Sequence, residues 1–80
     1  MGSLDQVAIG SATRVARVEG EDSTACRLLE MGLTPGVSVR VVRRAPLGDP
    51  LELEVRGYRL SIRRTDARRI AVSAAAHRPR

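Results

Sequence analysis

The chain has 80 residues, which is enough for one domain with a small hydrophobic core and too few for two. It contains one tyrosine and neither phenylalanine nor tryptophan, so the core must consist of valine, leucine and isoleucine, which favour strands. The formal net charge is +5, and every basic residue is an arginine. This charge fits an acidic partner, and it also fits a coding bias on an ordinary surface, since acidic residues are interspersed through most of the chain.

The single cysteine, Cys26, excludes an internal disulfide and fits a reducing compartment. No stretch has the composition of a signal peptide or the length of a membrane span. We therefore expect a cytoplasmic protein.

The first predicted strand spans Thr13 to Val18, which is rich in β-branched residues, and an apolar lead-in that starts at Leu4 precedes it. Val15 and Val18 differ in parity along this strand. Either a bulge separates them or only one of them faces the core.

One short helix is predicted over Ser23 to Met31. Asp22 or Ser23 can accept a hydrogen bond from a free amide in the first turn, as an N-cap does. Apolar residues at i, i+3 and i+4 form the face expected to point to the core, namely Ala25, Leu28 and Leu29.

The residues after this helix carry a helix stop followed by a turn. Gly32 at C′ can adopt a positive φ, and Leu33 can then fold back on Leu28 in a Schellman motif. The next four residues, TPGV, match a type II turn with Pro35 in the second position and Gly36 in the third. The sequence thus predicts a helix that leads directly into a strand.

That strand is predicted over Val37 to Arg44, where valines alternate with polar residues. The following hexapeptide, Ala45 to Pro50, must be a loop because two prolines and a glycine prevent regular pairing. A further strand with one solvated face is expected over Leu51 to Val55.

Gly57-Tyr58 is interpreted as a two-residue type II′ turn that joins this strand to the next. The expected cross-strand pairs are Arg56 with Arg59, Val55 with Leu60, Glu54 with Ser61, Leu53 with Ile62, and Glu52 with Arg63. This register places apolar residues opposite apolar ones and pairs one acid with one arginine.

Thr65 to Arg68 is expected to form a capped single turn, and Ile70 with Val72 a short closing strand. Residues 1–73 would then be a single domain, and residues 74–80 a disordered tail rich in arginine and alanine. The predicted fold is mainly β, a small barrel of about five strands with one short α-helix after the first strand.

The series LLEMGLTPG, APLGDP and LELEVRGYRLSIRRTDARRIAV resembles the ferrous iron transport protein A family, FeoA, and the likeness extends from Ser3 to Val72. The resemblance implies an SH3-like β-barrel and a cytoplasmic accessory to the ferrous iron transporter FeoB, whose cytosolic part carries a GTPase. The protein would be peripheral to the membrane through that partner. Similar domains also occur at the C-terminus of iron-dependent transcriptional repressors. A free-standing adaptor of such a regulator is therefore an alternative.

By the same resemblance, the contact with the partner is expected around the helix exit and a neighbouring loop. The residues carried over are Leu29, Met31, Gly32, Leu33, Pro35, Gly36, Pro46, Leu47, Gly48, Asp49 and Pro50. Turn geometry and capping already account for the glycines, Pro35 and Leu33. Leu47 differs, because an apolar residue within a Pro/Gly loop has no evident core to enter.

We expect no enzymatic activity, no cofactor and no metal site. Cys26 and Glu30 are four residues apart on the helix and His77 lies in the tail, which is too few ligands for a closed site. Cys26 is interpreted as a small buried hydrophobe. No catalytic triad or phosphate-binding loop is present in the sequence, although an arginine acting on the partner's nucleotide stays open.

A nucleic-acid-binding barrel is the main alternative from another class. It would use arginines of the last third of the chain on phosphates, namely Arg59, Arg63, Arg64, Arg68 and Arg69. The lack of aromatic residues for base stacking argues against it, since Tyr58 is alone. Open strand edges also leave a weak homodimer as an alternative.

Overall fold

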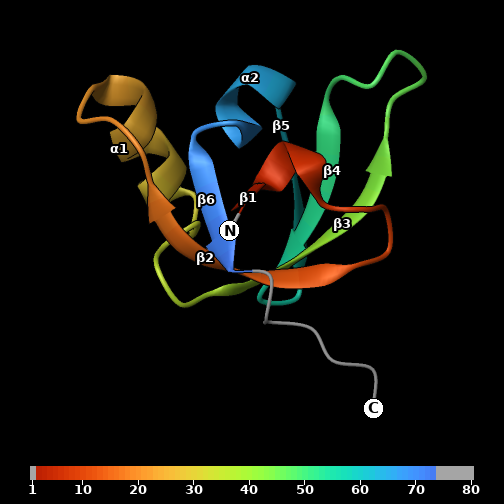
Figure 1. The fold of residues 1–80 in the computed structure, drawn as a ribbon, viewed down its shortest axis with the longest axis horizontal. Coiled ribbons are helices and arrows are strands. Elements are labelled where there is room, and N and C mark those ends of the chain that lie inside the picture. The colour runs from red at the N-terminus through yellow and green to blue at the C-terminus, as the bar shows by residue number, and fades with distance from the viewer. Residues whose placement is uncertain (1, 74–80) are drawn as a thin grey trace.

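The computed structural model describes residues 2–73, so the predicted tail lies outside the described residues. Six antiparallel strands form one sheet in the order β1-β6-β2-β3-β4-β5 (Figure 1). The strands are β1 (Gly2–Ser3), β2 (Ala12–Val18), β3 (Ser38–Arg44), β4 (Leu51–Val55), β5 (Tyr58–Ile62) and β6 (Ile70–Ser73). The helices are the 3-10 helix η1 (Leu4–Gln6), α1 (Ser23–Glu30) and α2 (Arg64–Ala67).

The prediction of a mainly β fold with one short helix after a first long strand is confirmed, with one difference in the strand count. The sequence pattern missed β1, whose two residues pair with Val72 and Ala71 of β6. A two-residue strand carries no periodicity, so only its partner in the sheet reveals it. The apolar lead-in forms η1, with Leu4 fully buried.

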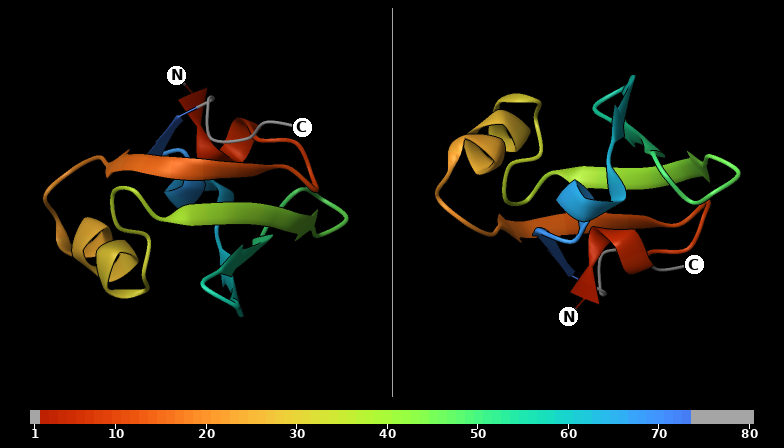
Figure 2. Two further views of the ribbon diagram at one scale, coloured as in Figure 1. Left: turned by 90° about the horizontal axis from the view of Figure 1, so that it is seen from below. Right: turned by 90° about the horizontal axis from the view of Figure 1, so that it is seen from above.

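The sheet curls around the core. β2 and β3 run side by side, while β4 and β5 bend away at one margin and β6 with β1 at the other (Figure 2). The helix α1 lies at one end of this pair of strands, and the β3–β4 loop lies at the other end (Figure 2). The largest fully buried side chains are aliphatic: Leu4, Leu28, Leu33, Leu51, Leu53, Ile70, Val15, Val39, Val41 and Val55.

A bulge in β2 resolves the parity problem. The register with β6 shifts between Val15 and Arg17, so that buried Val15 and half-buried Val18 both pack on the core. A second register shift, between Val41 and Arg43 of β3, had no signal in the alternating sequence pattern.

The predicted register of the β4–β5 hairpin is wrong. The two loop residues are Arg56 and Gly57, with φ of 53° and 88°, and Val55 pairs with Tyr58. Two positive φ angles are typical of a type I′ turn rather than type II′. Each β4 residue is thus paired two positions earlier on β5 than predicted, which keeps apolar opposite apolar, so side-chain alternation could not distinguish the two registers.

Candidate functional site

The helix exit is built as the sequence predicts. The amide of Leu33 donates to the carbonyl of Leu28 over 3.2 Å, and the amide of Gly32 donates to that of Leu29 over 3.0 Å. These are the two bonds of a Schellman motif, with Met31 as the C-cap and Gly32 at a φ of 106°. The chain therefore leaves α1 in one defined direction.

The turn that follows is tied to β2. The amide of Val37 donates to the carbonyl of Thr34 over 3.0 Å, and Gly36 has a φ of 91°, as a type II turn requires. The amide of Gly36 also donates to the carbonyl of Val15 over 2.7 Å. The turn is consequently part of the rigid scaffold.

A third contact at the helix exit was not foreseen from the sequence. The hydroxyl of Tyr58, at the start of β5, donates to the carbonyl of Met31 over 2.6 Å. Gly32 lies so near this hydroxyl that a Cβ would collide with it. The one aromatic residue of the chain therefore holds the C-terminus of α1 to the sheet.

The helix exit presents only part of its predicted contact residues to solvent. Leu33 is fully buried, and its role is in the core. Leu29 is 37% exposed instead of facing the core, Met31 is half-buried, and Pro35 is exposed. We call Leu29, Met31, Pro35 and Gly36 the helix-exit surface.

The prediction that Cys26 is buried is wrong, because its side chain is exposed on α1. The buried residues of this helix are Ala25 and Leu28. Leu29 follows Ala25 by four residues and lies at the margin of the apolar face. This short helix therefore packs on the core through Ala25 and Leu28.

The β3–β4 loop forms a second surface, which contains Pro46, Leu47, Gly48, Asp49 and Pro50. Leu47 is 91% exposed at its tip. The loop is closed by a bond from the amide of Ala45 to the carbonyl of Pro50 over 3.1 Å. A carboxylate oxygen of Asp49 accepts a hydrogen bond from the amide of Arg64 over 3.0 Å, which joins the loop to the first residue of α2. The loop is thus anchored at its base, with its leucine in solvent.

The structure does not bring the two predicted groups together. The helix-exit surface precedes β3 and the β3–β4 loop follows it, and they lie at opposite ends of the molecule (Figures 1 and 2). The seven residues of β3 span roughly 20 Å. A single small contact patch cannot include both.

The arginines of the proposed nucleic-acid surface differ in their pairing. Arg68 lies 3.6 Å from Asp5 and Arg69 lies 2.9 Å from Asp22, so acids of this chain engage both. The hydrogen bond from Arg69, together with that from the amide of Ala25, lowers the pKa of Asp22, which is the N-cap of α1. The predicted basic surface is thereby reduced to Arg59, Arg63 and Arg64.

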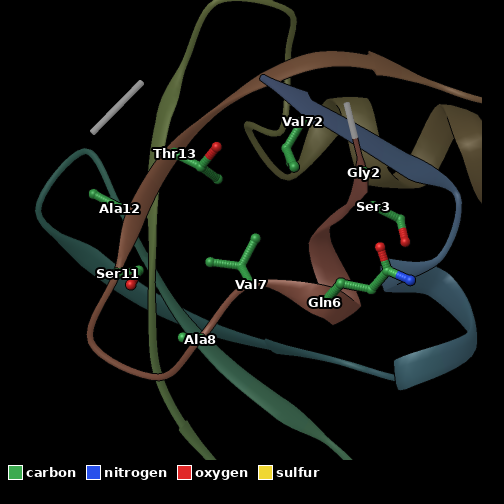
Figure 3. A pocket seen from close by; sticks show the side chains of 9 residues that line it. All are labelled: Gly2, Ser3, Gln6, Val7, Ala8, Ser11, Ala12, Thr13 and Val72. Atoms are coloured by element: carbon green, nitrogen blue, oxygen red, sulfur yellow. The ribbon is translucent and has the colours of Figure 1, made fainter. Parts of the chain in front are cut away.

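A hollow of about 340 Å³ lies between η1, β2 and β6 (Figure 3). Val7 and Val72 give it apolar walls, and Gln6 and Thr13 contribute polar side chains. None of the predicted contact residues lines it.

Within residues 2–73, no three His, Cys, Asp or Glu side chains gather into a group that could hold a metal ion. In the described part of the chain, no helix has both the length and the apolar character needed to cross a membrane.

Solved structures define the class of protein. A FeoA-like protein from Clostridium acetobutylicum matches with a TM-score of 0.87 and 30% identity, over 99% of this chain and 92% of that one. FeoA from Stenotrophomonas maltophilia complexed with zinc, a procaryotic SH3 domain protein for which a role as a ferrous iron transport activating factor has been suggested, matches with a TM-score of 0.83 and 31% identity. That match covers 95% of this chain and 94% of that one. The curled sheet is therefore that of an SH3-like domain.

The family follows from the sequence comparison. The model of the FeoA domain matches residues 2–74, and the chain belongs to the FeoA family. A relative from Porphyromonas gingivalis, an Fe(2+) transport protein A/Fe(2+) transporter FeoB fusion protein, is 39% identical over 69 residues. These residues are 86% of this chain and only 8% of that relative.

Proposed function

We propose that this chain is a cytoplasmic accessory protein of ferrous iron transport that binds the cytosolic, GTPase-bearing part of a FeoB-like transporter. The observation that supports this proposal most is the relative in which a domain similar to this chain is joined to FeoB in one polypeptide. Covalent linkage raises the effective concentration of two domains for each other, which is useful when the domains bind. The chain would reach the membrane only through this partner and would carry out no chemical step of its own.

The β3–β4 loop is the stronger candidate for the contact. Leu47 is almost fully exposed, so no packing within residues 2–73 accounts for an apolar residue there. The bond between Asp49 and the amide of Arg64 restrains the base of the loop. A restrained loop loses less conformational entropy on binding than a free one, which favours affinity.

The helix-exit surface is the second candidate. Leu29 is partly exposed and Met31 is half-buried, and methionine adapts its shape to an apolar partner. The Schellman bonds and the Tyr58 hydroxyl hold the backbone beneath these side chains. Since the two surfaces are separated by the length of β3, the partner must either span this distance or use one surface alone.

Co-purification with detergent-solubilised FeoB tests the proposal, with Leu47→Asp and Leu29→Asp as separate variants. Ile9→Asp is the matched control, because Ile9 is an exposed apolar residue (57%) outside both surfaces. An aspartate in an apolar contact should reduce recovery by at least about tenfold. The control should co-purify like the wild type, and circular dichroism verifies that each variant is folded.

Full recovery of both folded variants would contradict the proposed contact surfaces. Failure of the wild-type chain to co-purify at all would contradict binding to the transporter. Loss in only one variant would identify the surface in use. GTP turnover by the transporter, measured with and without the chain, then shows whether binding regulates it.

A further inference from the structure

Four arginines of the described part of the chain lie close together in the sequence and have no acidic side chain of that part at ion-pair distance. Within residues 2–73, six other arginines form ion pairs, and Arg14 and Arg44 donate to backbone carbonyls. The four without such a contact are Arg56, Arg59, Arg63 and Arg64, and all are exposed. They are distributed over the β4–β5 turn, β5 and the start of α2. The excess positive charge of this part of the chain is therefore concentrated along β5.

Among the strands that the structure describes, β5 is also terminal in the sheet and is paired with β4 alone. A two-residue hairpin loop is closed by a hydrogen-bonded pair, here Val55 with Tyr58, and bonded and non-bonded pairs alternate from there. Arg59 and Ser61 consequently direct their amides and carbonyls away from β4. No backbone hydrogen bond to another described segment involves either residue. The strand thus offers free donors and acceptors at its outer edge.

Charges on the outer face of the sheet alternate from strand to strand. Arg40 of β3 contacts Glu54 of β4 over 2.5 Å, and Arg43 lies 3.9 Å from Glu52. Glu54 in turn is opposite Arg59 of β5. The series from β3 to β5 is therefore basic, acidic and basic, and the complementary next strand is acidic.

We propose that the free edge of β5 binds an extended acidic segment of another protein as an added strand. The backbone of the segment would bond to Arg59 and Ser61, and its outward acidic residues would pair with the guanidinium groups of Arg59 and Arg63. Its alternate residues are apolar, because they lie beside half-buried Leu60 and exposed Tyr58 on the opposite face. The edge of β5 adjoins the helix-exit surface at Tyr58 and the β3–β4 loop at Arg64, but the proposal uses different groups from those proposed for the transporter and does not depend on them.

Other occupants fit the edge less well. A second copy of β5 in antiparallel pairing would bring arginines close to arginines, and like charges across strands are destabilising. Single-stranded nucleic acid would satisfy the charge, but it needs stacking platforms. Tyr58 is the one aromatic ring within residues 2–73, and its hydroxyl is already bonded to Met31.

The test uses a capped synthetic heptapeptide in which glutamate and valine alternate, titrated into the full chain and followed by amide NMR shifts. The largest shifts and the slowest hydrogen exchange are expected at Arg59 and Ser61. Ser61→Pro removes an outward amide without removing a bond to β4, so it should weaken binding by at least about tenfold, while Ser61→Ala should not. Arg59→Glu with Arg63→Glu should have a similar effect, and Arg14→Glu with Arg17→Glu on β2 is the charge-matched control.

Equal weakening by the control pair and the β5 pair would overturn the proposal, because binding would then follow net charge alone. A twenty-nucleotide single-stranded DNA that binds as tightly as the peptide and displaces it would overturn it in favour of nucleic acid. If Ser61→Pro does not fold, the two arginine pairs decide the question. Absence of peptide binding to the wild-type chain at low salt would also overturn it.

Discussion

The phenol of Tyr58 donates a hydrogen bond to the backbone carbonyl of Met31, which joins the first residue of β5 to the C-cap of α1. A carbonyl at the end of a helix has no partner within the helix, so this bond satisfies a group that would otherwise need water. Gly32 follows directly and leaves room for the hydroxyl. The contact defines how the helix-exit surface is presented.

Tyr58→Phe removes this bond and should lower the free energy of unfolding by about 0.5–1.5 kcal/mol. Gly32→Ala should lower the free energy of unfolding by more. The alanine would have to adopt a positive φ, and its Cβ would collide with the hydroxyl. In the Tyr58→Phe background the collision is relieved, so the cost of Gly32→Ala should fall. Urea denaturation of the two single variants and the double variant measures this coupling.

Gly36→Ala is the control for the backbone contribution. Gly36 also has a positive φ, but a Cβ there would meet nothing within 4 Å. Its cost should be the same with and without the Tyr58 hydroxyl. Additive effects of Gly32→Ala and Tyr58→Phe would contradict the proposed steric coupling.

The β4–β5 turn should accept a stabilising substitution at Arg56. Arg56 has a φ of 53°, a conformation that asparagine tolerates better, and Asn-Gly is a favoured pair in type I′ turns. Arg56→Asn should therefore raise the free energy of unfolding by about 0.5–1 kcal/mol. Thermal denaturation measures the effect, and Arg59→Asn, on the strand, should bring no such gain. Destabilisation by Arg56→Asn would contradict the type I′ geometry.

Asp22 should contribute to the acid dependence of stability. Its pKa is lowered in the folded chain, first by the hydrogen bond from Arg69 and then by that from the amide of Ala25. A lowered pKa means that the contribution is fully present above the unfolded-state value of about 3.9 and is lost as the pH falls through the folded-state value. Asp22→Asn keeps a capping oxygen without the charge, so its melting temperature should decrease less than that of the wild type between pH 6 and pH 2.

Glu21→Gln removes the neighbouring exposed carboxylate and serves as the control for this titration. It removes one carboxylate, as Asp22→Asn does, and so shows how much of the change follows from the loss of a charge alone. An unchanged acid dependence in Asp22→Asn would show that the contact with Arg69 does not favour the folded state.

Features of the chain that depend on a few consecutive residues could be predicted from the sequence. The helix stop at Gly32 and the turn at Pro35-Gly36 have the predicted form, and of the two predicted N-caps, Asp22 and Ser23, the structure uses Asp22. Each rests on the conformations available to one residue or on a bond within one turn of chain. The family resemblance likewise rested on short motifs, and the FeoA domain match over residues 2–74 confirms it.

Features that depend on contacts between distant residues could not be predicted from the sequence. Hydrophobic alternation has a period of two, so it permitted two hairpin registers, and pairing around Arg56-Gly57 emerged only in the folded sheet. The bond from Tyr58 to Met31 spans 27 positions, and the exposure of Cys26 reflects how α1 sits on the core. The distance between the helix-exit surface and Leu47, and the arginines left unpaired along β5, were likewise set by packing in three dimensions, because local chemistry carries no information about which remote groups will meet.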